Sequence, residues 1–496
     1  MKGIRLSLIM VVFLCNHLAA QKLNYPLTKK LPKTNTYHNI EVIDNYHWLE
    51  NTKSSEVQEW VTKQNKISLK YLKKLSNANR SKSKMKSYLW SEMDYDKYTI
   101  PKKNRDYYYR LMYSGRNSPL SIYYTKGNTT SFERLISPNS ISTKDRITFT
   151  NLVPSYNDHF LAYQYNRNGS DWQEIKIVGI KKRHFFKETL KDVINPQINW
   201  YGQGFFYVKN QFNSEKVSRS FPELMYHKLG TEQIEDKKIF NVNTKDESLR
   251  LYGLEKQSLY ILKKSDNSKN KYSYYYLRPK QDVKEFTPLF KNINYDISLH
   301  HFKNDTIIAS TKIKNKNYVI KFPIKQSKKW ALLTPSYKDA VFTSAVLADK
   351  KIVTSYQSKE SSILTVTDFN GRLLGEILTP NGLSADDLYF NDEKKELTFR
   401  LSSYTVPPVT CKLDLHTYKF SYLGKKAVAF DASKYKFIKT DFISHDNTKV
   451  PIFIVYKDSL PKSGATPFLL KTYGGYGVVA KPSYDPGVIS FIENGG

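Results

Sequence analysis

The amino-acid sequence predicts a seven-bladed β-propeller, an all-β fold, followed by the first part of an α/β domain. Three observations support this prediction. Pairs of apolar strands recur at regular intervals through the middle of the chain, helical periodicity is confined to a segment before them, and a strand that ends in a glycine-rich turn follows them. The 496 residues are 40% hydrophobic and 14% aromatic, which excludes a disordered chain and supplies a large packed core.

The N-terminus has the pattern of an export signal. Two basic residues precede the apolar run Leu6–Leu14, and Leu18-Ala19-Ala20 supplies a small-residue cleavage site. The run is shorter than the roughly 20 apolar residues of a transmembrane helix. We therefore expect residues 1–20 to be a signal peptide and the protein to be exported, either periplasmic or secreted. A buried N-terminal strand is the alternative, and a lipoprotein anchor at Cys15 is disfavoured by the bulky leucine before it.

The positive charge of the chain is large but diffuse. The net charge of +32 falls to +30 without the signal peptide, because Lys2 and Arg5 are removed with it. The longest basic runs are short, as in Lys181-Lys182-Arg183, and no zinc-finger spacing or RNA-binding signature accompanies them. We expect no nucleic-acid partner, although a diffuse cationic surface binder remains an alternative. Cleavage also removes Cys15, which leaves Cys411 without a partner for an internal disulfide.

Residues 21–85 are a mixed segment that ends in a helix. Ser55 followed by Gln58 predicts a capping box, and apolar residues from Val57 to Leu72 recur at near-helical spacing. We interpret the aromatic cluster Tyr46-His47-Trp48-Leu49-Glu50, which precedes the helix, as a packing element.

From residue 86 to residue 430, paired short strands rich in Tyr, Ile, Val and Phe replace the helical pattern. The first strand of each pair recurs at intervals of 44 to 54 residues. These first strands begin near Tyr107, Leu161, Phe205, Ser258, Thr306, Ile352 and Leu397. The second strands are Ser121–Thr125, Glu174–Val178, Leu224–Leu229, Tyr272–Arg278, Tyr318–Pro323, Ser362–Asp368 and Thr410–Asp414. Repeats of about 40–50 residues with several strands each are typical of a β-propeller, so seven repeats predict seven blades. A set of unrelated β-sandwiches is the alternative.

After residue 430 the pattern changes again. Phe437–Ile443 and Val450–Tyr456 are predicted strands on either side of a polar turn, and Pro467–Thr472 is predicted as an apolar strand that runs into Tyr473. A continuous apolar strand that ends in a glycine-rich turn suits the buried centre of an α/β sheet. Because ligands of such sheets lie outside the carboxyl ends of strands, Tyr473 occupies a position at which function is expected.

Most motifs that carry catalytic or binding chemistry are absent from the sequence. It contains no nucleophile elbow Gly-x-Ser-x-Gly, P-loop, dinucleotide fingerprint, His-Glu-x-x-His or Cys-x-x-Cys. The ten histidines are scattered, and the pair His300-His301 has no matching acidic cluster, so we interpret them as packing or surface residues. No metal and no cofactor is expected.

Several segments, in order along the chain, resemble the prolyl oligopeptidase family of serine peptidases. The first are Asp44-Asn45-Tyr46-His47-Trp48-Leu49-Glu50, Trp60-Val61 and Gln64-Asn65. Within the repeats they are Asn168-Gly169-Ser170-Asp171-Trp172, Tyr226-His227-Lys228-Leu229-Gly230-Thr231 and Ser402-Ser403-Tyr404-Thr405-Val406-Pro407-Pro408. The last are His445-Asp446-Asn447-Thr448-Lys449-Val450-Pro451 and Tyr473-Gly474-Gly475-Tyr476-Gly477. The resemblance extends over residues 36–496.

The resemblance implies a seven-bladed propeller that caps an α/β-hydrolase domain. In this arrangement, residues 21–85 are the N-terminal segment of the hydrolase domain and residues 86–430 are the propeller. Residues 431–496 begin the C-terminal catalytic part of the hydrolase domain, which we expect to be truncated.

The resemblance also assigns roles to two tyrosines. Tyr473 takes the place of the tyrosine whose hydroxyl stabilises the oxyanion that develops on the scissile carbonyl. Tyr476 takes the place of a pocket-lining phenylalanine, and its added hydroxyl weakens the expectation that it binds substrate. The Ser, Asp and His of the family's triad would lie beyond Gly496, so no residue of this sequence is assigned to the triad.

The function implied by the resemblance is that of an exported serine endopeptidase that cleaves short peptides on the carboxyl side of proline, without metal or cofactor. Its partners would be short proline-containing peptides, and its propeller would limit substrate size. A monomer with no membrane contact after signal cleavage is expected. Because the triad is missing, we expect the 496-residue chain itself to be inactive. The alternative is a non-catalytic exported propeller that binds peptides.

Overall fold

The structure of the chain is a computed structural model. It describes residues 24–52, 54–74, 102–104, 106–112, 118–127, 131–212, 219–242, 244, 246–254, 258–279, 285–313, 316–335, 337–358, 361–391, 394–423, 431–461, 464–473 and 481–496. The predicted signal peptide, with Cys15, lies outside the described residues. The chain divides into two compact units, Met1–Arg80 and Ser81–Gly496, and each is described by itself. Within the described ranges, no helix has the length and apolar character needed to cross a membrane.

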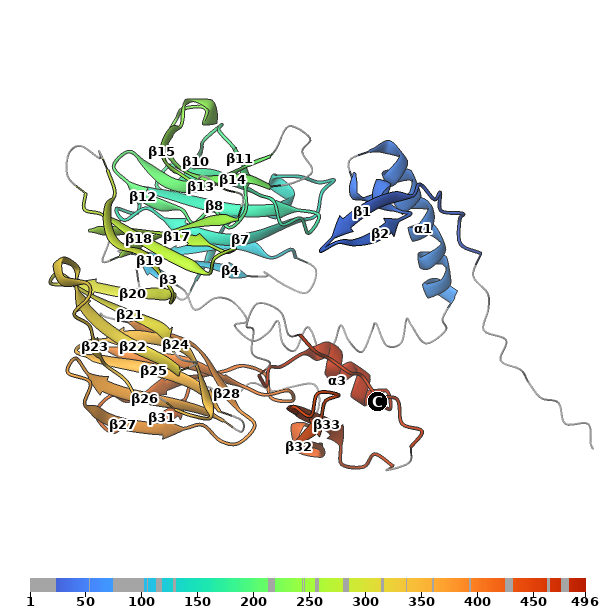
Figure 1. Ribbon diagram of the computed structural model, residues 1–496. Helices are drawn as coiled ribbons and strands as arrows, with labels where there is room; N and C mark the ends of the chain where they lie inside the picture. The colour runs from blue at the N-terminus through green and yellow to red at the C-terminus, as the bar shows by residue number, and fades with distance from the viewer. Residues whose placement is uncertain are drawn as a thin grey trace, which may run out of the picture. The chain divides into compact units, whose positions relative to one another are not determined.

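The first unit contains a β-hairpin and one long helix (Figure 1). Strands β1 (Lys33–Tyr37) and β2 (Ile40–Asp44) pair in antiparallel fashion. The two residues between them, His38 and Asn39, have φ angles of 49° and 64°. Positive φ at both positions is the geometry of a two-residue hairpin turn whose twist matches that of the strands. Asn and His are among the residues that adopt this conformation most readily, so the local sequence favours the turn.

Helix α1 (Ser55–Lys74) follows the hairpin, and its cap differs from the predicted one. The Oγ of Ser54, not of Ser55, accepts a hydrogen bond from the backbone N–H of Val57 at 3.2 Å. The side chain of Gln58 donates to the carbonyl of Thr52 at 2.5 Å instead of completing a capping box. The predicted capping box is therefore wrong: the cap lies one residue earlier, at Ser54, and Gln58 does not make the reciprocal bond. Two consecutive serines offer the same capping chemistry, and the one before the first helical residue takes the role.

The aromatic cluster before the helix packs as predicted, around two tryptophans. The ring of Trp48, in the short helix η1 (His47–Glu50), meets the ring of Trp60 edge to face, with 6.5 Å between centroids. Trp48 Nε1 donates to the carbonyl of Lys29 at 2.9 Å, and Trp60 Nε1 donates to Thr28 Oγ1 at 3.0 Å. These contacts attach the segment before the hairpin to helix α1.

The second unit contains seven antiparallel sheets that follow one another along the chain, six with four strands and one with five. Blade 1 is β3 (Lys102–Asn104), β4 (Tyr107–Met112), β5 (Ser121–Lys126) and β6 (Glu133–Ile136). Blade 2 is β7 (Ile147–Pro154), β8 (Phe160–Arg167), β9 (Gln173–Gly179), β10 (His184–Phe185) and β11 (Leu190–Val193), the last two both pairing with β9. Blade 3 is β12 (Asn199–Tyr201), β13 (Gly204–Phe212), β14 (Arg219–Lys228) and β15 (Lys237–Asn241).

The remaining four sheets have the same order of strands. Blade 4 is β16 (Glu247–Leu254), β17 (Leu259–Asp266), β18 (Lys271–Leu277) and β19 (Thr287–Ile293). Blade 5 is β20 (Ile297–Lys303), β21 (Thr306–Ile313), β22 (Lys316–Pro323) and β23 (Ala331–Leu332). Blade 6 is β24 (Ala340–Ala348), β25 (Lys351–Ser358), β26 (Ser362–Asp368) and β27 (Leu373–Leu378). Blade 7 is β28 (Ser384–Asn391), β29 (Glu396–Ser402), β30 (Val409–Leu413) and β31 (Phe420–Tyr422). The predicted seven-bladed β-propeller is confirmed.

The two strands predicted in each repeat are the second and third strands of each blade. For example, the strand predicted to begin near Thr306 is β21, and the strand predicted at Tyr318–Pro323 is β22. The fourth strand of the same blade, β23, has only two residues, and both are exposed. Outer strands of this kind carry too few buried side chains to produce an apolar pattern in the sequence.

The central strands are apolar because both of their faces are buried. In β13, Phe205 and Tyr207 pack into a cluster shared with blade 2, whereas Phe206 and Val208 pack into a cluster shared with blade 4. Successive side chains of a strand point to opposite faces, so a central strand between two neighbouring blades can bury side chains on both faces. Clusters of this kind join each blade to the next from blade 1 to blade 7.

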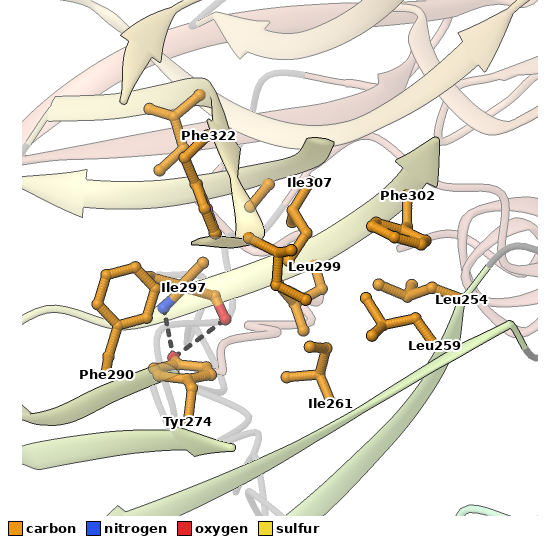
Figure 2. Close-up of a cluster of buried hydrophobic side chains, with 13 residues drawn as sticks. Leu254, Leu259, Ile261, Tyr274, Phe290, Ile297, Leu299, Phe302, Ile307 and Phe322 are labelled. Atoms are coloured by element: carbon orange, nitrogen blue, oxygen red, sulfur yellow. Dashed lines mark hydrogen bonds between the residues drawn. The ribbon is translucent and has the colours of Figure 1, made fainter. Parts of the chain in front are cut away.

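One of these clusters, between blades 4 and 5, contains thirteen buried residues. Figure 2 shows the hydroxyl of Tyr274 directed at the backbone of Ile297. This hydroxyl accepts a hydrogen bond from the Ile297 N–H at 2.6 Å and donates to the Ile297 carbonyl at 3.1 Å. The rings of Phe290 and Phe322 meet edge to face, with 5.5 Å between centroids. The cluster thus buries aromatic area without leaving the tyrosine hydroxyl unpaired.

After the propeller, the described residues contain a hairpin and a short helix. Strands β32 (Tyr435–Ile443) and β33 (Lys449–Lys457) form the predicted pair. Helix α3 (Pro486–Glu493) lies beside this hairpin (Figure 1) and packs Ile489 and Ile492 against Tyr435. The sheet of an α/β-hydrolase domain is not seen among the described residues.

The strand predicted at Pro467–Thr472 is wrong. These residues have no regular secondary structure, and Phe468, Leu469 and Leu470 are exposed. A strand exists only when neighbouring strands pair with its backbone, and no described strand pairs with this segment. The apolar pattern predicts which residues tolerate burial in a sheet, but it does not supply the partner strands.

Candidate functional site

Tyr473, the residue predicted to donate to an oxyanion, follows this unpaired segment. Its side chain is 58% exposed, so its hydroxyl is accessible to a ligand. Two residues earlier, Lys471 Nζ forms an ion pair with Asp485 Oδ2 at 2.7 Å. Asp485 is also the N-cap of α3, where its Oδ1 accepts a hydrogen bond from Gly487 N–H at 2.8 Å. The segment that ends at Tyr473 is therefore tethered to the start of α3.

Tyr476, the residue predicted to bind substrate, lies outside the described residues. The roles of Tyr473 and Tyr476 remain predictions. The sequence contains no Gly-x-Ser-x-Gly, so no nucleophilic serine is assigned to a site with Tyr473.

The C-terminal hairpin and the segment before α3 are held against blade 7. Lys481 forms an ion pair with Asp386 of β28, and the hydroxyl of Ser384 donates to the carbonyl of Pro482. The ring of Tyr404, which follows β29, packs 5.8 Å from the ring of Phe437 in the hairpin. Tyr404 belongs to one of the segments that carry the family resemblance, and this contact gives that segment a structural role.

A buried histidine–carboxylate pair lies in blade 3. His227 on β14 and Asp236 are both fully buried, and the distance from His227 Nδ1 to Asp236 Oδ1 is 2.7 Å. The hydroxyl of Tyr207 donates to the other oxygen of Asp236 at 2.6 Å, and Gln233 Nε2 donates to that hydroxyl at 3.1 Å. Burial, together with the Asp236 carboxylate, raises the pKa of Tyr207 well above its ordinary value, so the phenol stays protonated and keeps donating.

This pair has the orientation of a catalytic histidine and its carboxylate, but it lacks a nucleophile. Within the described residues, His227 Nε2 has no hydrogen-bond partner, and the nearest acidic oxygen, Glu188 Oε1, lies 3.9 Å away. A base in acyl transfer must reach a hydroxyl or thiol at hydrogen-bond distance. We therefore assign the His227–Asp236 pair to the fold, where it attaches the connection between β14 and β15 to the central strands.

His300 of β20 is a packing residue, as predicted. Its Nε2 lies 2.9 Å from the hydroxyl of Ser310, and its ring contacts Phe342 of blade 6 with 6.0 Å between centroids. Burial lowers the pKa of His300 to about 4. His301 has its pKa lowered as well, by burial and by the charge of Lys303.

These shifts predict a stability that falls with acidification. The unfolded chain binds a proton at His300 below a pH of about 6.5, whereas the folded chain does so only near 4. The unfolded state therefore binds more protons between these values, and the free energy of unfolding decreases as the pH falls from about 6.5 to about 4. Urea unfolding of the wild type and of His300→Gln across this range measures the contribution. We expect a shallower pH dependence in the variant, and equal slopes would contradict the assignment.

No group of three or more His, Cys, Asp or Glu side chains in the described part of the chain is placed to hold a metal ion. Cys411 is buried in blade 7, and burial raises the pKa of its thiol to about 11. A thiol in this environment stays protonated at neutral pH and is a poor nucleophile.

Comparison with known families identifies the propeller. Residues 25–425 match the family model described as prolyl oligopeptidase, N-terminal beta-propeller domain. The chain belongs to the prolyl oligopeptidase family. The match includes the seven blades and the preceding hairpin and helix, in the order found in the structure.

Relatives in the family are similar to this chain along nearly its whole length. The chain is 26% identical to a prolyl endopeptidase of Elizabethkingia miricola over 512 residues, covering 100% of this chain and 71% of that protein. It is 22% identical to a dual-function macrocyclase-peptidase of Galerina marginata, and that match covers 95% of this chain and 70% of the relative. Among solved structures, one from a study of two prolyl endopeptidases superposes with a TM-score of 0.84 at 20% identity, covering 95% of this chain and 70% of that one. Galerina marginata prolyl oligopeptidase B, bound to a 25-residue macrocyclization substrate, superposes with a TM-score of 0.80 at 20% identity. That match covers 95% of this chain and 70% of the solved one.

Proposed function

We propose that this chain supplies the propeller and the oxyanion tyrosine of an exported prolyl oligopeptidase-type serine endopeptidase, which hydrolyses short peptides on the carboxyl side of proline. The observation that carries the proposal is the family match over residues 25–425. The prolyl endopeptidases that match the chain from end to end support the same reaction. The propeller would limit substrate size, and residues 1–20 would direct export.

In this proposal, residues 21–85 and 431–496 belong to an α/β-hydrolase domain. The hydroxyl of Tyr473 donates a hydrogen bond to the oxygen of the carbonyl that is attacked. A tyrosine hydroxyl held near that carbonyl donates to the negative oxygen of the tetrahedral intermediate more strongly than to the neutral substrate. The exposure of the Tyr473 side chain and the tether from Lys471 to Asp485 support this role. Tyr476 would line the adjoining substrate pocket.

We propose further that the 496-residue polypeptide is catalytically inactive by itself. The sequence contains no Gly-x-Ser-x-Gly, so it has no serine held on the strained turn that hydrolases of this type use. The His227–Asp236 pair does not replace it, because Nε2 has no hydroxyl partner among the described residues. Such a chain could still bind proline-containing peptides, and one related enzyme, Galerina marginata prolyl oligopeptidase B, has been solved with peptide substrates bound.

The peptidase function is tested with a chain extended past Gly496 by its own genomic reading frame. If that frame encodes Gly-x-Ser-x-Gly followed by Asp and His, we expect hydrolysis of a proline-containing chromogenic peptide. Replacing Tyr473 by Phe in the extended chain should lower kcat by about 100- to 1000-fold, the effect of losing one oxyanion donor. Tyr422→Phe, at another exposed tyrosine, is the matched control. Equal rates for Tyr473→Phe and the control would remove Tyr473 from the mechanism, and cleavage without preference for proline would contradict the proposed specificity.

A further inference from the structure

A pocket of about 340 Å³ lies between blades 5 and 6, away from the C-terminal segment that carries Tyr473. The register of the strands in blade 5 places several of the lining residues side by side. His301 of β20 pairs with Ile308 of β21, which pairs with Lys321 of β22, which pairs with Ala331 of β23. One row across four strands therefore presents these four side chains to the same face of the blade. Phe369, after the last residue of β26, closes the pocket from blade 6.

The charged side chains of the lining are all cationic. Three lysines contribute to it, Lys303, Lys321 and Lys329, and the described residues that line the pocket include no Asp or Glu. Lys321 Nζ is held by the carbonyl of Phe369, which fixes its ammonium group at the wall. In the part of the chain that the structure describes, Lys303 and Lys329 form no ion pair. The carboxylate nearest in sequence, Asp305, is 2.7 Å from Arg278 Nη2 and is thereby engaged elsewhere.

Apolar side chains also line the pocket. Ile308 is buried, Phe369 is half-buried and Pro323 is exposed at the rim. The Nε2 of His301 is inaccessible to solvent and has no hydrogen-bond partner among the described residues. Because solvent does not reach Nε2, a ligand in the pocket does not contact it either, and the site depends on the lysines and the apolar wall.

We infer that this pocket binds a small organic carboxylate with an apolar body, such as an N-acylated amino acid or a short aryl-substituted fatty acid. The lysine ammonium groups attract the carboxylate, and the apolar wall removes the remainder of the ligand from water. The volume is within the range of sites that take small molecules, and the absence of acidic side chains in the lining rejects cations. The site does not depend on the proposed peptidase function, because it shares no residue with the segment around Tyr473.

The binding is tested by calorimetric titration of the purified chain with 4-phenylbutyrate and with its uncharged counterpart, 4-phenylbutanamide. We expect the carboxylate to bind at least about tenfold more tightly than the amide and to weaken as salt is added. Lys329→Met and Lys303→Met should each weaken binding of the carboxylate several-fold and leave binding of the amide unchanged. Ala331→Trp places a large side chain in the pocket from an exposed position of β23 and should abolish binding of both compounds.

Lys237→Met, at an exposed lysine of β15 in blade 3, is the matched control and should bind like the wild type. Each variant is compared with the wild type in thermal unfolding, and the two lysine variants decide the outcome if Ala331→Trp does not fold. The proposal is overturned if the wild type binds the amide as tightly as the carboxylate or binds neither. It is also overturned if Lys303→Met and Lys329→Met bind 4-phenylbutyrate with the affinity of Lys237→Met.

Discussion

Replacement of His227 by alanine should lower the free energy of unfolding by roughly 3 kcal/mol. The substitution removes the imidazole that lies 2.7 Å from Asp236, and among the described residues the buried carboxyl group then keeps one side-chain partner, the hydroxyl of Tyr207. An acidic group that has lost its partner in the protein interior has no water to replace it. Urea unfolding followed by tryptophan fluorescence measures the loss, because Trp200 lies in the same blade.

The control for this experiment is His416→Ala, at an exposed histidine of blade 7. A surface substitution of this kind changes stability by no more than about 0.5 kcal/mol. A double-mutant cycle with Asp236→Ala separates the pairing from the loss of imidazole volume, because the two losses should not add if the groups act together. Equal stability of His227→Ala and His416→Ala would show that the buried pair does not hold blade 3 together.

Replacement of Phe322 by alanine should cost about 3–5 kcal/mol. Phe322 is fully buried between blades 4 and 5, where its ring meets that of Phe290 (Figure 2). The substitution removes apolar contacts and leaves a cavity within a cluster of thirteen buried residues. Thermal and urea unfolding measure the loss.

Two further variants calibrate the Phe322 result. Phe322→Leu retains most of the apolar volume and should lose less than half as much stability as the alanine variant. Phe221→Ala, at a phenylalanine of β14 that is 42% exposed, should be close to the wild type. If Phe322→Ala were as stable as Phe221→Ala, the packing between blades 4 and 5 would not be a source of stability.

The sequence predicts the number of blades because the central strands of a propeller are buried on both faces. In β13, four consecutive residues from Phe205 to Val208 are buried, and the second strand of each other blade also carries several buried apolar residues, which recur along the sequence. The outer strands do not stand out, since β10 and β23 have two residues each and expose them. These outer strands form because they pair with the central strands. The β-propensity of their own residues does not predict that pairing.

The candidate site could be predicted only in part, for the same reason. The position of Tyr473 follows from its motif, but the apolar residues before it need partner strands that the described chain does not provide. The pairing of His227 with Asp236 joins two residues nine positions apart through a loop, and no periodicity connects them. The lining of the pocket in blade 5 depends on strand register, which places His301 and Lys321 on either side of Ile308. In the sequence these residues are a histidine pair and separate lysines, and nothing in their spacing predicts a pocket.

We propose that the 496 residues of this chain contain the propeller and an oxyanion donor, Tyr473, but no nucleophilic serine of the family's type. The most direct measurement is the hydrolysis of a proline-containing chromogenic peptide by the purified 496-residue chain, with the Elizabethkingia miricola prolyl endopeptidase as the active reference. We expect no turnover above the buffer rate, since loss of the nucleophile and base lowers kcat by a factor of about a million. Turnover that a serine-directed phosphonate abolishes would contradict the claim, because it would reveal a nucleophilic serine within these residues.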